Sequence, residues 1–481
     1  MENRINQKKY IPLKDYSPID PAELPADLQD DLMNLTGAIP IWEQPGTQKD
    51  SIALISRNGD LLRTEGYIGF VQIREYQIFI KSRFDGENDN NFTNYLISKA
   101  LDINARLFDR MHVPAERARA MEKLLAVAFV QKVRQAYKKG IFRQYRTFER
   151  NDAKVKGKID FTRHIKYNPL PNGRIAYSYR EYTPDNDMNR LFLTAYEELM
   201  KRHGGLMRIL LERERTVTEC ITKMKNFVSP VSKQETQKLL KKTNKKIRHS
   251  IYKDWEDVRK ISLMVLRHFG YFVPEKGEKE SIGVVVSVAG LWENYLLNLL
   301  RTIPGFEGIE YQKSVPIFQN KKETETEEKL KARKRLSSQI IMDFYIKREE
   351  SGIVLDAKYK PMWSSLLKEP NSRLPLPDFY QVMFYANAMH CEKCGILCPV
   401  NGDGKDILQI RPSDPVAGMP EFGVNGLVVP SISEAGDEKE SYEKFKQAMK
   451  QAEENFKGRI KEFYGLKKNS PLTNAKINGK L

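Results

Sequence analysis

Two aspartates and a lysine stand in apolar sequence where a folded chain rarely places charge. Asp343 and Asp356 each lie inside a strand-like run, IIMDFYI and GIVLDAK, and a short polar turn joins the two runs. A charge in a half-buried strand is unfavourable unless a partner or a cation compensates it. Lys358 follows Asp356 at i+2, so in an extended strand their side chains share one face and Ala357 turns to the other. Such a hairpin face suits a divalent cation and an attacking water, and the pattern predicts a hydrolytic site.

The predicted cation is Mg²⁺, or Mn²⁺ in its place. Mg²⁺ takes hard oxygen ligands and is usually bound by one or two carboxylates, waters and substrate phosphate. Asp343 and Asp356 can supply those oxygens, with the carbonyl of Ala357 as a third ligand. Lys358 would position the water or stabilise developing negative charge. The alternative is a structural salt-bridge triad at a sheet edge.

Sequence context, rather than the tripeptide Asp-Ala-Lys itself, makes this prediction. The same tripeptide occurs at residues 152–154, but there it lies in the polar run RNDAKVKGK with no apolar strand before it. Only residues 356–358 have an apolar strand before them, an acid-bearing strand upstream and a helical pattern downstream. The hairpin is therefore the candidate catalytic element.

Three further residues are candidates for the same site. Glu293 lies among strongly apolar residues of a predicted helix, GLWENYLLNLL, and could direct an additional carboxylate at the cation or its water; an exposed helix-surface glutamate is the alternative. Gln381 and Tyr385 stand four residues apart in DFYQVMFYANAMH, so they share one helical face. They could line a DNA groove or support Lys358, although Tyr385 could also simply pack.

Charge and composition narrow the class of protein. The chain has 481 residues, 40% of them apolar, with 80 Lys and Arg against 63 Asp and Glu, a net charge of +17. This length predicts several folded domains, and the basic excess favours a polyanionic partner such as double-stranded DNA. No apolar run reaches the roughly 18 residues of a membrane span, and the N-terminus lacks the apolar segment of a signal peptide. We therefore expect a cytoplasmic protein.

The four cysteines allow a second metal hypothesis. Cys391, Cys394 and Cys398 follow His390 at spacings that can chelate a metal, but no second ligand pair stands at a matching spacing. Residues 395–398 have the pattern of a short buried strand, which favours structural thiols. Cys220 stands apart from this group.

The order of patterns predicts a mixed α/β, or α+β, multidomain fold. We expect an N-terminal domain at 1–150, with a β-meander over 51–83 and then helices, and a helical, basic connecting region at 151–275. A third domain at 276–466 would hold a central mixed sheet flanked by helices, and a disordered tail would occupy 467–481. Within the connecting region, AKVKGKIDFTRHI is expected to be extended, and Asn186 is expected to cap a helix. Residues 321–335 are expected to form a solvated loop or insertion. The basic runs 154–158 and 241–248 are candidate phosphate contacts, with an ordinary solvated face as the alternative for each.

These motifs together resemble the PD-(D/E)xK nuclease superfamily. An acid on one strand, D-A-K on the next, an acid on the preceding helix and Q-x-x-x-Y on the following helix carry the resemblance. Within the superfamily the chain is most similar to the McrC family, the nuclease subunit of McrBC-type, modification-dependent restriction systems. LDAKYK, DFYQVMFYANA, GKIDFTRHI, NDMNRLFLTAYEEL and the meander EGYIGFVQI…IFIKSRF support that similarity. The first acid stands in IIMDFY rather than after a proline, which departs from the superfamily pattern.

The resemblance implies a division of labour between two proteins. McrC-like proteins of prokaryotes cut DNA, while a separate AAA+ GTPase hexamer of the McrB type reads the modified base, such as 5-methylcytosine, and translocates. The chain has no G-x-x-x-x-G-K-[ST] motif, so we expect GTP to be bound by the partner. The resemblance implies that residues 1–150 dock to the partner and stimulate its GTP hydrolysis, while 151–275 contact DNA. Two alternatives are a non-catalytic DNA-binding adaptor of a motor complex and a stand-alone PD-(D/E)xK nuclease of a repair or mobile-element system.

Overall fold

The computed structural model describes residues 9–35, 38–41, 51–87, 89–100, 114–247, 249–268, 281–306, 308–316, 339–348, 351–368, 373–402, 419–431 and 438–465. Helices and sheets of mixed strand direction follow one another along these residues, so the predicted mixed α/β, multidomain fold class is confirmed. The predictions made for 321–335 and for the tail at 467–481 lie outside the described residues. Among the described helices, none is both long enough and apolar enough to cross a membrane.

The N-terminal region is built around a five-stranded sheet in the order β1-β7-β6-β11-β3, in which β11 (Ser281–Ser287) comes from much later in the chain. Strands β6 and β7 form the antiparallel hairpin expected from the meander, and β1 is parallel to β7. A second, small sheet in the order β2-β5-β4 packs on the first through a shared apolar core that also takes in helix α1. The bounds are β1 Lys9–Lys14, β2 Pro18–Ile19, η1 Pro21–Glu23, α1 Ala26–Met33, β3 Ala38–Ile41, β4 Ile55–Asn58, β5 Leu61–Thr64, β6 Tyr67–Ile73 and β7 Tyr76–Lys81.

The expected Asn-Gly hairpin joins β4 to β5. Asn58 pairs with Leu61, which leaves Gly59 and Asp60 as a two-residue loop. Gly59 has φ +62°, a conformation that glycine adopts without the strain a side chain would bring.

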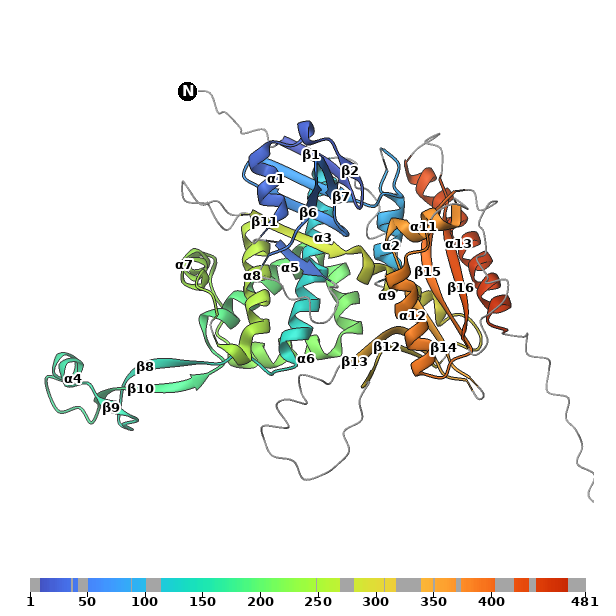
Figure 1. Cartoon of the computed structure of the whole chain (residues 1–481). Coiled ribbons are helices and arrows are strands. Elements are labelled where there is room, and N and C mark those ends of the chain that lie inside the picture. Colours follow the sequence, from blue (N-terminus) through green and yellow to red (C-terminus); the bar gives the residue numbers. More distant parts are fainter. Residues whose placement is uncertain are drawn as a thin grey trace, which may run out of the picture.

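A group of helices forms the middle of the molecule (Figure 1). Helices α3, α5 and α8 pack together around an aromatic core in which Phe129 stacks on Phe192 and the edge of Trp255 meets Phe192. Asn186 caps α5 as expected, because its side chain accepts a hydrogen bond from the backbone N–H of Asn189. The bounds are α2 Asn91–Ala100, α3 Pro114–Tyr137, α5 Asp187–Arg213, α6 Arg215–Phe227, α7 Lys233–Thr243, η3 Ser250–Tyr252 and α8 Lys253–His268.

A long β-hairpin projects from this helical group (Figure 1). Strands β8 (Gln144–Asp152) and β10 (Ile175–Thr183) pair over nine residues, and β9 (Lys158–Ile159) pairs with β10 near the far end. The expectation that FTRHI is extended is wrong: Phe161–Tyr167 is helix α4, because the Asp160 side chain accepts from the N–H of Arg163 and caps it. We call residues 144–183 the arm.

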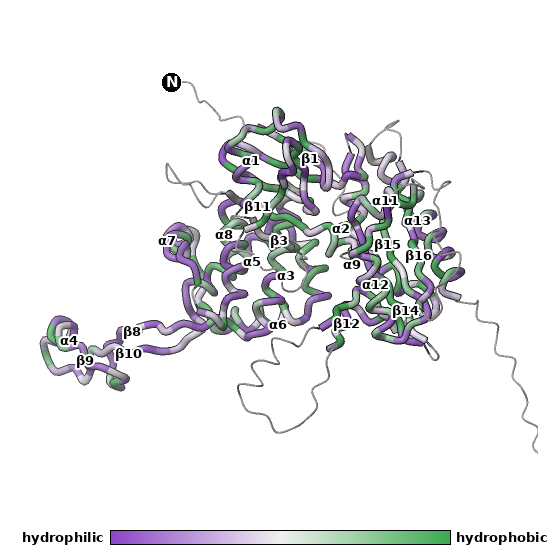
Figure 2. Tube along the Cα trace, in the orientation of Figure 1, coloured by the Kyte–Doolittle hydropathy of each residue, from purple (hydrophilic) through white to green (hydrophobic). Residues whose placement is uncertain are grey.

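The C-terminal region is a five-stranded sheet in the order β12-β13-β14-β15-β16. The first three strands are antiparallel, and β14, β15 and β16 run parallel. Strands β15 and β16 are almost continuously apolar, as expected for strands covered on both faces (Figure 2). The bounds are β11 Ser281–Ser287, α9 Val288–Leu300, β12 Ile309–Pro316, β13 Gln339–Ile346, β14 Ile353–Ala357, α11 Pro361–Lys368, α12 Leu376–Ala388, β15 Lys393–Asn401, β16 Glu421–Val429 and α13 Glu438–Phe463.

Two elements cross the boundaries expected from sequence. Strand β11, assigned by sequence to the third domain at 276–466, pairs with β6 and β3 and therefore belongs to the N-terminal sheet. Helix α2, assigned to the first domain at 1–150, packs against α9 and α13 of the C-terminal region (Figure 1). The chain thus enters the C-terminal region twice from the N-terminal sheet, after β7 and again after β11, and the two regions share one apolar core.

Candidate active site

The two strand carboxylates lie on one face of the β13–β14 hairpin. The register pairs Phe344 with Leu355, so Asp343 and Asp356 occupy the next cross-strand position. Oδ2 of Asp343 accepts a hydrogen bond of 2.8 Å from the backbone N–H of Ala357. The side chain of Asp356 is buried, and its Oδ2 accepts no hydrogen bond of good geometry. The hairpin therefore presents two carboxylates at the point where the strands separate.

Lys358 lies directly beyond β14, and its backbone still belongs to the sheet. Its N–H donates to the carbonyl oxygen of Leu397 at 2.9 Å, which continues the parallel ladder by one residue. Its Nζ lies 2.8 Å from Oδ2 of Asp356 and donates to Oε1 of Gln381 at 3.2 Å. Nε2 of Gln381 in turn donates to Oη of Tyr385 at 2.8 Å. The structure thus brings together the strand triad and the helical Gln-Tyr pair that the sequence singled out.

Asp378 also belongs to this cluster, although sequence reasoning missed it. Its Oδ1 lies 3.6 Å from Nζ of Lys358, and its Oδ2 accepts a hydrogen bond of 2.9 Å from Nε1 of Trp363. Asp378 stands one helical turn before Gln381 on α12, so the spacing i, i+3 was the available signal. The lysine ammonium is therefore held among two carboxylates and an amide oxygen.

Glu293 is buried on α9, with 1% of its surface exposed, which rules out the alternative of an exposed helix-surface residue. Its Oε2 accepts hydrogen bonds of 3.3 Å from Oη of Tyr311 and from Nε2 of Gln312. Gln312 has φ +49° and interrupts the ladder opposite Asp343, while the register on either side is unchanged. Neither Tyr311 nor Gln312 was expected at the site, and a backbone conformation gives no sequence signal.

The electrostatics of the cluster are those of crowded carboxylates. Burial, then the charges of Asp356 and Glu293, raise the pKa of Asp343 well above its ordinary value. Burial also raises the pKa of Asp356, and the neighbouring Lys358 only partly opposes this. For Lys358 burial acts to lower the pKa, but the carboxylates of Asp356, Asp378 and Asp343 together outweigh it and the pKa is raised. Lys358 is therefore a cation near neutral pH, suited to stabilise negative charge and not to act as a base.

The donor set suits a hard divalent cation. Asp343 and Asp356 offer carboxylate oxygens, and the mutual repulsion of the two carboxylates would be relieved by a bound cation. Across the residues that the structure describes, no three His, Cys, Asp or Glu side chains converge to form a complete metal cage. Two carboxylates match Mg²⁺, which is usually bound by one or two protein carboxylates, retains waters and takes substrate phosphate.

The three late cysteines form a different environment. Cys394 and Cys398 lie four residues apart on β15, which separates their Cα atoms by about 13 Å along an extended strand. Both are buried in the apolar layer under α11 and α12, where Sγ of Cys394 contacts Sδ of Met383 at 3.6 Å. Burial raises the pKa of Cys394 to about 12, so the thiolate that a metal requires is disfavoured. The geometry favours structural thiols.

Comparisons with known proteins agree with the motifs. The family model of the McrBC 5-methylcytosine restriction system component matches residues 62–398. No curated protein matches the chain. A solved half-complex of Thermococcus gammatolerans McrB AAA+ hexamers with bound McrC is similar at 14% identity and TM-score 0.42, over 95% of this chain and 100% of that one. A second structure, the McrBC complex of the same organism, is similar at 13% identity and TM-score 0.26, over 61% of this chain and 88% of that one. The family match spans well over half of the sequence, and the chain therefore belongs to the McrBC 5-methylcytosine restriction system component family.

Proposed function

We propose that this chain is the Mg²⁺-dependent endodeoxyribonuclease subunit of a McrBC-like, modification-dependent restriction system. The observation that carries the proposal is the meeting of Asp343, Asp356 and Lys358 on one hairpin face, with Lys358 2.8 Å from Asp356. Family membership supports the restriction system, and the site supports the chemistry. The fold around the site, a mixed sheet with helices on both faces, is consistent with a PD-(D/E)xK nuclease domain.

The residues of the site have distinct roles in this proposal. Asp343 and Asp356 hold the cation, with the carbonyl of Ala357 as the predicted third ligand and Glu293 as an auxiliary acid. A bound Mg²⁺ would polarise the scissile phosphate and favour a hydroxide-like water. The Lys358 ammonium, charged in its carboxylate surroundings, stabilises the negative charge that develops on the phosphate.

Gln381 and Tyr385 support this lysine from helix α12. Because Nε2 of Gln381 donates a 2.8 Å hydrogen bond to Oη of Tyr385, the amide oxygen of Gln381 is oriented for its contact with Lys358. We assign the pair a supporting role, in preference to direct contact with DNA.

We further propose that the chain works with an AAA+ GTPase hexamer whose hydrolysis it stimulates. The Thermococcus structure contains McrB AAA+ hexamers with bound McrC, which is the kind of assembly we propose here. Besides residues 1–150, the arm is a candidate surface for this protein partner, because it projects from the body (Figure 1) and exposes large apolar side chains. Phe161, Ile165 and Leu170 are 70%, 72% and 76% exposed.

The DNA partner is supported by charge. The net charge of +17 favours a polyanion, and lysines 154, 156 and 158 on the arm are all exposed. Neutralised phosphates release counterions, so we expect DNA binding to weaken steeply with salt.

The test is cleavage of 5-methylcytosine-containing plasmid DNA by the full chain with Mg²⁺, GTP and the cognate AAA+ protein. We expect Asp356→Ala to abolish cleavage while the stimulation of GTP hydrolysis is unchanged. Glu310→Ala is the control, because it removes an exposed acid from the edge strand β12 of the same sheet and should cut normally.

Three outcomes would count against the proposal. Full cleavage by Asp356→Ala would remove the catalytic assignment. An absence of cleavage and of Mg²⁺ binding by the wild type would favour a non-catalytic adaptor. Cleavage at full rate without GTP or partner would favour a stand-alone nuclease.

A further inference from the structure

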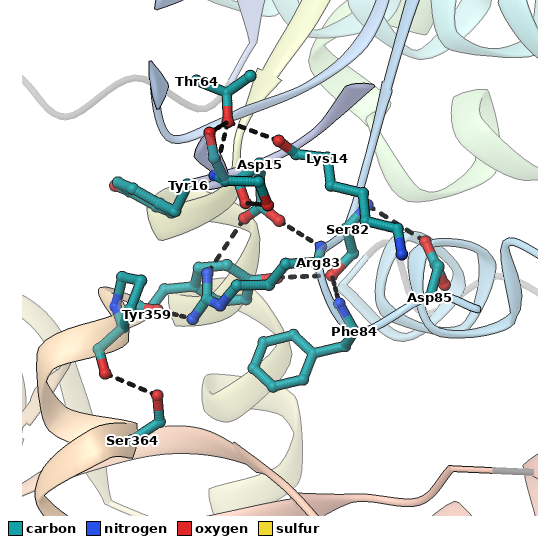
Figure 3. Close-up of polar contacts among 12 residues, drawn as sticks. Lys14, Asp15, Tyr16, Thr64, Ser82, Arg83, Phe84, Asp85, Tyr359 and Ser364 are labelled. Carbon is teal, nitrogen blue, oxygen red and sulfur yellow. Dashed lines mark hydrogen bonds and ion pairs between the residues drawn. The ribbon is translucent and has the colours of Figure 1, made fainter. Parts of the chain in front are cut away.

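The residue after the candidate catalytic lysine is anchored by the N-terminal region. Tyr359 is buried, and its Oη shares a hydrogen bond of 2.8 Å with Oγ of Ser82 (Figure 3). Nη2 of Arg83 donates to the carbonyl oxygen of Tyr359 at 2.5 Å, and the guanidinium lies 4.4 Å from the centre of its ring. Ser82 and Arg83 directly follow β7, so two segments about 276 residues apart meet here.

Arg83 is itself held rigidly in this position. Its Nη1 lies 3.2 Å from Oδ2 of Asp15, a carboxylate with no exposed surface, and its backbone N–H donates to Oδ1 of the same residue at 2.5 Å. The ring of Phe84 lies 4.6 Å from the guanidinium on another side. The planar guanidinium therefore connects the buried Asp15 carboxylate to the backbone of Tyr359, a two-acceptor geometry that a lysine ammonium does not reproduce.

These contacts fix the backbone on both sides of the Lys358 side chain. On one side, the N–H of Lys358 donates to the carbonyl oxygen of Leu397 at 2.9 Å. On the other side, the carbonyl oxygen of the following residue, Tyr359, accepts from Arg83. Leu397 also accepts from Nε1 of Trp292 at 3.1 Å, and Trp292 packs against the Tyr359 ring with centroids 6.1 Å apart. Because Trp292 precedes Glu293 on α9, the same packing relates the lysine segment to the auxiliary acid.

We propose that Arg83 is a positioning residue of the nuclease site, acting through Tyr359 to hold Lys358 in register with Asp343 and Asp356. The N-terminal sheet is then part of the active-site support, and not only a platform for a partner. This inference rests on the proposed nuclease function for its activity readout, and its structural readout is independent of that function.

The decisive variant is Arg83→Lys. The lysine retains a cation beside Asp15, and the backbone N–H at position 83 still donates to that carboxylate, so the fold is preserved. The variant loses the guanidinium donor to the carbonyl oxygen of Tyr359 and the cation–π contact with the Tyr359 ring. We expect kcat for DNA cleavage to fall about 100-fold, the loss typical of a misplacement near 1 Å. KM for DNA, stimulation of the partner GTPase and Tm should stay close to wild type.

Arg63→Lys is the matched control. The Arg63 guanidinium also donates to a backbone carbonyl of the N-terminal region, that of Tyr16 at 3.2 Å and 3.1 Å, but makes no contact with residues 358–359. We expect this variant to cut DNA at the wild-type rate. Tyr359→Phe, which removes the hydroxyl contacts with Ser82 and Asp15 but keeps the ring, provides a milder second perturbation of the same segment.

Hydrogen exchange of the Lys358 amide supplies the readout that does not depend on cleavage. In Arg83→Lys and Tyr359→Phe the exchange of this amide should accelerate, with Arg83→Lys the larger, while Arg63→Lys leaves it unchanged. Unchanged exchange together with unchanged kcat in Arg83→Lys would overturn the inference. A kcat that falls only in proportion to Tm would also overturn it, because the role would then be purely structural. If the variants show accelerated exchange but the wild-type protein itself cuts no DNA, the nuclease proposal is refuted while the positioning of Lys358 by Arg83 stands.

Discussion

Asp343→Asn should stabilise the cation-free protein and destroy its response to Mg²⁺. The substitution keeps the shape of the side chain and an oxygen that accepts from the N–H of Ala357. It removes one negative charge from a half-buried position next to Asp356 and Glu293, whose charges raise the pKa of Asp343. The variant therefore separates two effects on stability: the repulsion among the carboxylates in the cation-free protein and the stabilisation by bound Mg²⁺.

The magnitude follows from the hairpin geometry. Directly opposite residues on antiparallel strands have Cβ atoms about 5 Å apart, and two unit charges at about 5 Å repel by roughly 3 kcal/mol at an effective dielectric constant near 20. Attraction to Lys358 cancels part of this repulsion, so we expect Asp343→Asn to gain about 1 kcal/mol, or about 2 °C in Tm, without a cation. The wild type at a Mg²⁺ concentration of 100 times Kd should gain about 2.7 kcal/mol, and the variant almost nothing.

The assay is thermal unfolding of both proteins in EDTA and across a Mg²⁺ series. The variant should melt above the wild type in EDTA and below it at saturating Mg²⁺, so the two curves of Tm against Mg²⁺ cross. Glu310→Gln, which removes an acid from the exposed edge strand β12, is the control and should show the wild-type Mg²⁺ response. Equal Mg²⁺ shifts in wild type and Asp343→Asn, or a lower Tm of the variant in EDTA, would refute the reasoning.

Further predictions concern the same site and the sheet beneath it. Lys358→Met should abolish cleavage but retain Mg²⁺ binding by calorimetry, whereas loss of both would make the lysine a structural residue. Tyr385→Phe leaves Gln381 without its fixed partner and should lower kcat by about 5-fold, the worth of one neutral hydrogen bond, with KM for DNA unchanged. Because a protonated carboxylate does not bind metal, Mg²⁺ affinity should fall as the pH drops through a window above 3.8, the ordinary pKa of an aspartate. Over the same window the cation-free protein should gain stability, because the folded state binds more protons than the unfolded state. A Mg²⁺ affinity that stays constant down to pH 4 would contradict the raised pKa of Asp343. Gly395→Ala places a Cβ 2.4 Å from a backbone carbonyl oxygen of β16 and should lower the free energy of unfolding by about 3 kcal/mol. Gly458→Ala, on the exposed face of α13, should raise it by about 0.5–1 kcal/mol. Denaturant unfolding measures both changes.

Local patterns in the sequence were enough to predict much of this molecule. The hairpin that carries Asp343 and Asp356, the β4–β5 turn, the cap at Asn186 and helix α12 all formed where their residues indicated. Each depends on interactions within a few residues, such as strand alternation, a φ available to glycine or a side chain that reaches the next helical turn. The prediction that FTRHI is extended was wrong for an equally local reason, because the helix cap that Asp160 provides was not recognised.

The sequence by itself identified the candidate catalytic residues, since acids and a lysine in apolar strands are visible without any structure. Only the tertiary structure decided how they are supported. In the folded protein Gln312 donates a hydrogen bond to the buried Glu293, and Asp378 forms an ion pair with Lys358. Strand β11 pairs within the N-terminal sheet, and Arg83 donates to the carbonyl oxygen of Tyr359. Those contacts connect residues far apart in the chain, and their energy depends on geometry created by the packed core. A sequence pattern with a period of two or 3.6 residues contains no information about such contacts.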